Sequence, residues 1–160
     1  MGHVEHIHIA PAEGAPLQEL NEVEAVSGVG LTGDRYATPE HGPDYDGGQD
    51  LTLVEAEALE RLAAEEGIQL EPGATRRNLT TRGVSLNDLV GKTFLVGDVL
   101  AKGIELCEPC NHLQQSIGKP ILRPLAHRAG LRAQLLTSGT IRVGDELKPA
   151  PESVAAGDLA

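Results

Sequence analysis

Short segments with β-strand character recur along this chain, separated by turns rich in glycine and proline. They lie at residues 4–10, 20–26, 76–83, 92–107 and 131–149. Many short strands bounded by such turns are typical of β-sandwiches and barrels. Only one long stretch has a clear helical pattern. We therefore expect a mainly β, barrel-like fold with a few short helices and some α+β character.

The helical pattern occupies residues 52–67, TLVEAEALERLAAEEG. Thr52 and Glu55 have the spacing of a capping box, and Gly67 would end the helix. Apolar side chains recur at helical spacing, namely Leu53, Ala56, Leu59, Leu62 and Ala63. This pattern predicts a helix that starts at Thr52.

The second half of the chain predicts three further features. Residues 92–107 predict two strands around a Val-Gly-Asp turn, and residues 131–149 a β-hairpin that turns at Ser-Gly. Residues 85–91 predict a short helical turn, and residues 112–130 one or two short helices interrupted by prolines.

The domain boundaries follow from these elements. We expect a single domain at residues 1–149 and a flexible C-terminal tail at residues 150–160, which is small and polar.

Composition and charge exclude several classes of partner. The formal net charge is −11, so we expect no nucleic acid and no anionic membrane as a partner. One Phe, two Tyr and no Trp leave no platform for stacking bases and require an aliphatic core. No segment has the apolar length of a signal peptide or a membrane span. We expect a cytoplasmic protein.

A long polar segment at residues 27–50 has no periodicity, and loops of this length in small domains are often functional. It contains GVGLTG, which matches the glycine pattern of dinucleotide-binding folds. That site needs the glycines to open a helix, whereas here Asp34, Arg35 and a proline follow, so we reject it. We expect the glycines to bend the backbone so that Asp34 and Arg35 face a ligand.

Two other motifs carry charged or metal-binding side chains. TRRNLTTRG brings Arg76, Arg77 and Arg82 together in an acidic chain, with Asn78 nearby. An arginine turned into a cleft binds phosphate or carboxylate well because its planar fork is bidentate. HVEHIH places His6 and His8 on one face of a strand. Two such histidines can share a metal, but we interpret them as surface residues of the strand.

The two cysteines of the chain form the motif Cys107-Glu-Pro-Cys110. A redox pair would suit the local strand-to-helix order but lacks a thioredoxin-like setting. A zinc site would need two further ligands, for which His112 and His127 are available. Cys110 alone, just before an expected helix, would be a reactive thiolate. The fourth alternative is a pair of buried core residues, and the motif alone does not decide among the four.

The order of several motifs resembles the MOSC domain, named for the C-terminal domain of molybdenum cofactor sulfurase, in its small stand-alone bacterial form. The matching pieces are VEHIHIAP, GLTGDRYA, RRNLTTRGVSLNDLVGKTFLVGD, GIELCEPCNHL and GLRAQLLTSGTIRVGDEL. They span roughly residues 3–148. No piece is decisive by itself, and the set in this order is fairly specific.

The resemblance implies a mainly β barrel and a molybdenum cofactor (molybdopterin), with no expectation of pyridoxal phosphate. It implies that Cys110 is the thiol that ligates molybdenum or carries sulfur as a persulfide. It also implies a cofactor pocket lined by Asp34, Arg35, Arg76, Arg77 and Asn78. Cys107, which not every member of the family has, would then resolve a persulfide on Cys110 by forming a disulfide.

The function implied is enzymatic or sulfur-handling. It is either the reduction of N-hydroxylated or N-oxide small molecules, or sulfur transfer, with a small-molecule substrate and an electron- or sulfur-donor protein as partners. Alternatives are a cofactor-free persulfide carrier, a carbon–sulfur lyase or desulfurase acting through Cys110, and a structural zinc protein. An unpaired edge strand would allow a homodimer.

Overall fold

The computed structural model of the 160-residue chain describes most of its length. The described residues are 2–12, 16–42, 45–71, 73–108, 114–115, 117–118, 120–121 and 125–150. Cys110, His112 and the expected tail at residues 151–160 lie outside them. Only parts of the expected helices at residues 112–130 are described.

Strands dominate the described part of the chain, and its helices include one long α-helix and one 3-10 helix. The strands in the first half are β1 (Gly2–Ile9), β2 (Gln18–Leu20), β3 (Glu22–Val26), β4 (Gly30–Leu31), β5 (Leu51–Glu55) and β6 (Leu79–Arg82). The strands in the second half are β7 (Thr93–Val96), β8 (Val99–Leu106), β9 (Leu131–Leu135), β10 (Gly139–Arg142) and β11 (Glu146–Pro149). The helices are α1 (Ala56–Glu66) and η1 (Leu86–Leu89).

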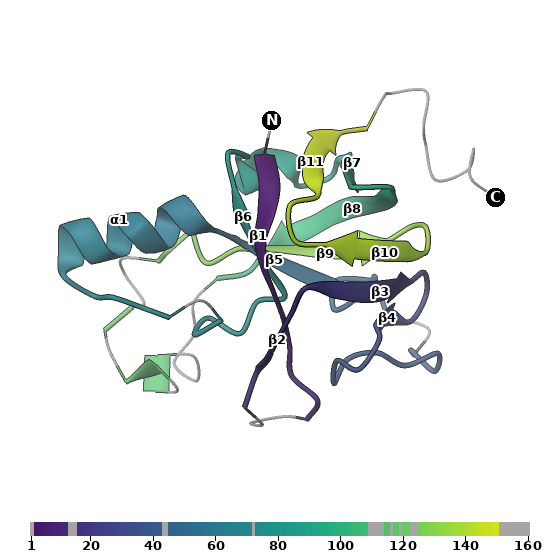
Figure 1. The fold of residues 1–160 in the computed structure, drawn as a ribbon, viewed down its shortest axis with the longest axis horizontal. Helices are drawn as coiled ribbons and strands as arrows, with labels where there is room; N and C mark the ends of the chain where they lie inside the picture. The colour runs from purple at the N-terminus through teal and green to yellow at the C-terminus, as the bar shows by residue number, and fades with distance from the viewer. Residues whose placement is uncertain are drawn as a thin grey trace.

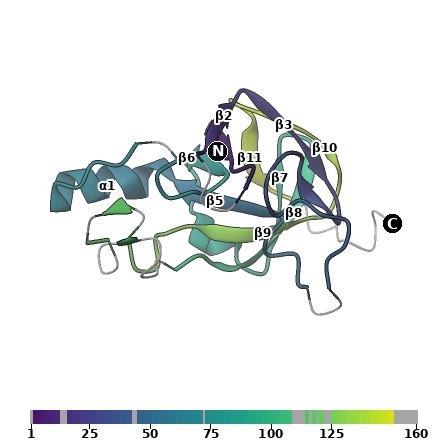
Figure 2. The ribbon, with the colours of Figure 1, turned by 90° about the horizontal axis from the view of Figure 1, so that it is seen from below.

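The strands close into a barrel, as expected. Hydrogen-bonded neighbours follow the order β11-β7-β8-β9-β5-β6-β1, and β1 pairs back onto β11. Strand β2 extends the sheet beyond β1, and β5 runs parallel to β6. A small sheet of β10, β3 and β4 lies against the barrel, and α1 projects away from it on the other side (Figure 1). Figure 2 shows the same projection of α1 from below.

The interior of the barrel is aliphatic, which confirms the expectation from the scarcity of aromatic residues. Alternate residues of β9, Leu131, Ala133 and Leu135, are buried, as a strand with one inward face requires. Phe94, the single phenylalanine, is fully buried among them. A separate cluster packs beside α1 and contains Leu62, Ile68, Ile121, Leu125 and Ala129.

The predicted helix start at Thr52 is wrong. Strand β5 continues to Glu55, because Leu51 and Leu53 point into the barrel and pair with β9. The hydroxyl of Thr52 therefore makes no cap. The Glu55 carboxylate makes none either: it accepts a hydrogen bond from the backbone N–H of Leu86 at 3.1 Å.

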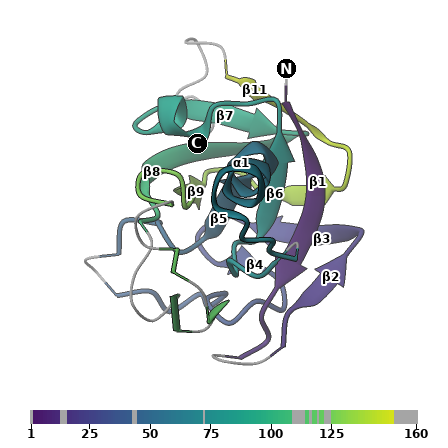
Figure 3. The ribbon, with the colours of Figure 1, turned by 90° about the vertical axis from the view of Figure 1, so that its left-hand side faces the viewer.

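The predicted end of the helix is confirmed. Gly67 takes the left-handed conformation at φ +67°, and its N–H donates to the carbonyl of Ala63. Figure 3 looks along α1, with the strands of the barrel around and behind it. Within the described residues, no helix combines the length and the apolar character needed to cross a membrane.

The predicted β-hairpin at residues 131–149 is also wrong. Strand β9 pairs with β5 and β8, whereas β10 pairs with β3 in the second sheet. Side-chain bonds from the connecting residues hold the chain where it leaves the barrel: Thr137 Oγ1 accepts from the N–H of Leu100 at 2.8 Å, and Ser138 Oγ accepts from the N–H of Ser27 at 2.9 Å. The Ser-Gly pair thus marks a change of sheet.

Two other predictions from the sequence are confirmed. Strands β7 and β8 pair around the Val-Gly-Asp turn, and η1 is the short helical turn. Gly30 lies in strand β4 and Gly33 in a turn, so no helix follows the glycine pattern and the rejection of a dinucleotide site is confirmed.

Candidate functional site

Asn78 connects three barrel strands through its side chain and is 6% exposed. Its Oδ1 accepts from the N–H of Thr52 at 3.0 Å and from the Thr52 hydroxyl at 3.1 Å. Its Nδ2 donates to the carbonyl of His8 at 3.1 Å. The backbone of Asn78 bonds to the same two residues. Asn78 thus ties β1 and β5 to the start of β6.

Arg77 precedes this junction and reaches the segment between β8 and β9. Its Nε donates to the carbonyl of Ala129 at 2.9 Å. The next residue, Gly130, accepts a hydrogen bond from the N–H of Cys107 at 2.8 Å. Arg77 therefore lies beside the strand end that leads into the Cys-x-x-Cys motif.

Cys107 is 1% exposed, and burial raises the pKa of its thiol above the ordinary value of 9.0. Arg77 and Arg132 oppose that shift, and Glu105 and Glu108 add to it. A thiol in this environment stays protonated at neutral pH.

Arg76 lies in a turn with unusual backbone geometry. Its φ is +63°, a left-handed conformation that is uncommon for residues other than glycine. Gly73, three residues earlier, has φ +90°, and a Cβ there would approach the His8 ring to 2.9 Å. Both residues line a hollow of about 350 Å³, together with Leu17, Glu71 and Ile117. That volume falls within the range of small-molecule sites.

Two buried polar atoms at this turn have no hydrogen-bond partner among the described residues. They are the hydroxyl of Thr75, which is 1% exposed, and Nδ1 of His8, which is 4% exposed. Unpaired buried polar atoms are costly and are rare outside functional or strained sites. With the positive φ angles of Gly73 and Arg76, they mark residues 73–76 as the most strained part of the candidate site.

Asp34 and Arg35 dock on the end of β1. Asp34 Oδ1 accepts from the N–H of Ala10 at 2.9 Å, and the N–H of Arg35 donates to the Ala10 carbonyl at 2.7 Å. The Arg35 guanidinium donates to the Tyr36 hydroxyl at 3.0 Å and lies 4.6 Å from the Tyr36 ring centre. It lines a different hollow, of about 400 Å³, formed with Pro11, Ala12 and Tyr36.

The structure thus divides the residues expected in the cofactor pocket. Arg76 lines the 350 Å³ hollow, and Arg77 links it to Cys107. The side chains of Asn78 and Asp34 are used in bonds that hold the backbone. Cys110 lies outside the described residues, so its position is not part of this geometry.

Sequence reasoning missed the environment of His8, which is not a surface residue. Its Nε2 lies 3.4 Å from a carboxylate oxygen of Glu19, whose other oxygen lies 3.2 Å from Nδ1 of His6. Burial lowers the pKa of His8, and Glu19 only partly offsets that effect. The hydrogen bond from His6 is the largest cause that lowers the pKa of Glu19. Among the described residues, no group of three or more His, Cys, Asp or Glu side chains could hold a metal ion.

The lowered pKa of His8 predicts a loss of stability in mild acid. The unfolded chain binds a proton at His8 near pH 6.5 while the folded chain resists it, so the stabilisation is complete above pH 6.5 and declines as the pH falls below that value. Urea unfolding at pH 7.5 and pH 5.5 should show this decline in the wild type. It should be smaller in His8→Gln, and a parallel decline in both proteins would contradict the assignment.

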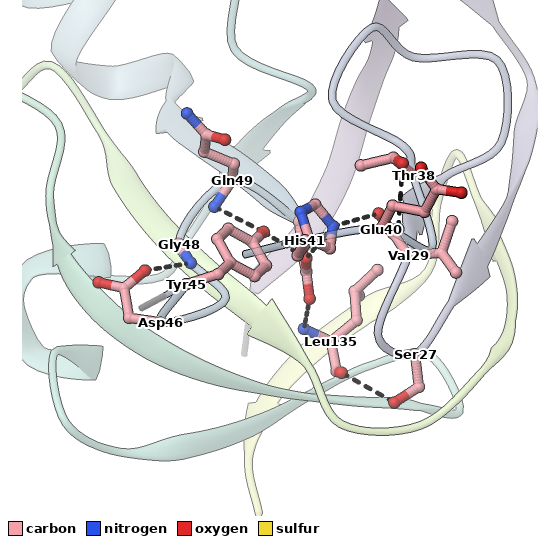
Figure 4. A network of polar contacts seen from close by, with 11 residues as sticks. Ser27, Val29, Thr38, Glu40, His41, Tyr45, Asp46, Gly48, Gln49 and Leu135 are labelled. Carbon is pink, nitrogen blue, oxygen red and sulfur yellow. Dashed lines mark hydrogen bonds and ion pairs between the residues drawn. The ribbon is translucent and has the colours of Figure 1, made fainter. Parts of the chain in front are cut away.

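The end of the long polar segment is anchored by a network that the sequence did not reveal (Figure 4). Asp50, 2% exposed, accepts from the Tyr45 hydroxyl at 2.5 Å and from the N–H of Leu135 at 3.0 Å. The His41 ring stacks on Tyr45 at 3.8 Å, and its Nε2 lies 3.1 Å from the carbonyl of Val29. Burial, followed by the bond to Asp50, raises the pKa of Tyr45. His41, Tyr45 and Asp50 thus anchor the end of the polar segment to strand β9.

Several solved structures share this fold. The YUAD protein from Bacillus subtilis superposes with a TM-score of 0.78 at 17% identity, covering 92% of this chain and 94% of that one. YiiM from Geobacillus stearothermophilus gives 0.71 at 16% identity, covering 98% and 78%. YiiM from Escherichia coli gives 0.67 at 19% identity, covering 95% and 71%.

Sequence comparison gives the family. No curated protein sequence matches the chain. The MOSC domain model, in contrast, matches residues 33–148, which include Asp34, Arg76 and Cys107. This range also covers every barrel strand except β1 and the last residue of β11. The resemblance found in the motifs and the barrel found in the structure are therefore confirmed, and the chain belongs to the MOSC domain family.

Proposed function

We propose that this MOSC protein binds a molybdenum cofactor and uses Cys110 as its reactive thiol. The observation that carries the proposal is the strained turn at residues 73–76. It places Arg76 on a hollow of about 350 Å³ and leaves the buried Thr75 hydroxyl without a partner among the described residues. A phosphate-bearing pterin needs such a cationic donor.

The residues present fit the anionic part of this cofactor. Arg76 borders the hollow, and Arg77 is fixed behind it by its bond to Ala129. A planar guanidinium on a turn that other contacts hold is suited to bidentate binding of phosphate. In this assignment Asn78 and Asp34 act through the backbone that they hold, and Arg35 lines a different hollow.

The thiol assignment favours Cys110 over Cys107. Cys107 is buried and its thiol pKa is raised, so it is a poor ligand for an incoming metal at neutral pH. Cys110 follows three residues later, and three residues of extended chain span at most about 11 Å. The covalent chain alone thus keeps Cys110 within about 11 Å of Cys107. Cys107 is left to act as a second thiol once Cys110 is oxidised.

Two reactions are open to such a site. A bound molybdenum centre supplies two-electron redox chemistry and a binding place for oxygen or sulfur. Reduction of an N-hydroxylated substrate would consume two electrons and two protons and release water, with the electrons coming from a donor protein. Sulfur transfer would instead move the outer sulfur of a donor protein's persulfide to the Cys110 thiolate, and the donor's thiolate would leave. A cofactor-free persulfide carrier is the second candidate, because the same thiolate suffices for it.

The thiol assignment predicts different reactivities for the two cysteines. We expect iodoacetamide at pH 7.5 to modify Cys110 at least about tenfold faster than Cys107, because burial shields the Cys107 thiol from the reagent and raises its pKa. Mass spectrometry of proteolytic peptides after timed quenching gives both rates in one sample. In urea the two rates should converge, which provides the control. Equal rates in the folded protein would contradict the assignment.

A further inference from the structure

A third hollow lies on the outside of the barrel, between α1 and the wall made by β1 and β6. Its volume is about 340 Å³. Leu59 and Ala63 of α1 and Leu70 of the following segment give it an apolar side. Residues 69–71 also border the hollow that Arg76 lines, so the two are neighbours. Its size suits a small molecule with an apolar part.

The charged side chains of this hollow leave it negative. Arg82 is bound by two carboxylates, with Nε at 2.9 Å from Glu5 Oε1 and a terminal nitrogen at 2.5 Å from Glu60 Oε2. Glu71 adds a third carboxylate to the lining. Three carboxylates against one guanidinium give an excess of two negative charges. Because the charge of Arg82 is already neutralised, the hollow favours a cation over an anion.

The side chain of Thr80 is a second, independent observation that points to a ligand in this hollow. It lies opposite His6 in the register of β1 and β6, so both side chains face the same side of the sheet, and both line the hollow. Thr80 is 3% exposed, and its hydroxyl has no hydrogen-bond partner among the described residues. A buried hydroxyl without a partner costs free energy, which a donor from a ligand would recover.

We propose that this hollow binds a small organic ammonium ion. The ammonium group would lie beside Glu71 and donate a hydrogen bond to the Thr80 hydroxyl oxygen. The alkyl part would pack against Leu59 and Ala63 of α1. This site is separate from the turn at residues 73–76 and does not depend on a molybdenum cofactor.

Titration of the purified protein with n-butylammonium tests the proposal. Amide chemical shifts should move saturably at residues 5–6, 59–63, 70–71 and 80–82. Neutral 1-butanol and anionic butyrate should bind much more weakly. Glu71→Gln should weaken butylammonium binding about two- to fivefold, as expected for one exposed charge pair. Glu65→Gln, the same change at an exposed helix position outside the hollow, should leave binding unchanged.

Thr80→Val separates a binding role from a structural one. Loss of the hydroxyl should weaken butylammonium binding about two- to fivefold. The melting temperature should stay equal or rise, because a methyl group replaces an unpaired polar atom. If Thr80 were only structural, stability would change without any change in affinity. That result would overturn the proposal, as would tighter binding of butyrate, the absence of saturable shifts, or equal effects of Glu71→Gln and Glu65→Gln.

Discussion

Gly130→Ala is expected to destabilise the protein by about 3 to 5 kcal/mol, a large part of the stability of a typical domain. Gly130 has φ +127°, and a Cβ there would lie 2.1 Å from the carbonyl oxygen of Leu53. The backbone cannot yield easily, because Gly130 also accepts the hydrogen bond from Cys107 and follows the carbonyl that binds Arg77. Urea unfolding monitored by circular dichroism measures the loss.

Gly28→Ala is the matched control for this substitution. Gly28 also has a positive φ, +79°, but a Cβ there would meet nothing within 4 Å. Only the left-handed strain remains, at about 1 to 2 kcal/mol. The difference between the two variants then measures the close approach of β5 to the segment before β9. Equal losses of unfolding free energy in the two variants would mean that the close approach to Leu53 does not destabilise Gly130→Ala.

Asn78→Ala should cost about 2 to 4 kcal/mol, because two partners are left unpaired at once. The variant leaves the N–H of Thr52 and the carbonyl of His8 without their side-chain partner, and it leaves a small cavity where β1, β5 and β6 meet. Thermal and urea unfolding give the loss directly. Asn78 would then contribute to the candidate site by fixing the backbone on which Arg76 and Arg77 stand.

Asn87→Ala provides the comparison for this second prediction. Asn87 is exposed, and its side chain makes a single hydrogen bond, to the carbonyl of His127 at 2.8 Å. A change at such a surface position should cost no more than about 0.5 to 1 kcal/mol. If Asn78→Ala were equally mild, the junction of three strands would not depend on that side chain.

The sequence could predict the barrel because its strands carry local signals. Leu131, Ala133 and Leu135 alternate as a strand requires, and glycine turns separate the segments. Residues 51–67 misled the prediction because a strand and a helix share one apolar stretch. Leu53 fits both the alternation of a strand and the apolar spacing of a helix. Only its pairing with Leu131 and Leu79 assigns it to β5.

The candidate site was predictable where chemistry follows from residue type, and unpredictable where it depends on distant contacts. Two adjacent arginines in an acidic chain predict an anion site at Arg76 and Arg77, and the structure places Arg76 on a hollow. The burial of His8 could not be predicted, because it depends on Gly73 and Glu19 folding against β1. The junction at Asn78 likewise depends on Thr52, which is 26 residues away.

Molybdenum content tests the central claim most directly. Wild type, Cys110→Ala and Cys107→Ala would be purified from a host whose cofactor supply is verified by an active molybdenum enzyme in the same cells. Elemental analysis by mass spectrometry then gives molybdenum per chain. The account predicts near-stoichiometric metal in the wild type and in Cys107→Ala, and its loss in Cys110→Ala. Absence of molybdenum from all three proteins, or its retention in Cys110→Ala, would contradict the account.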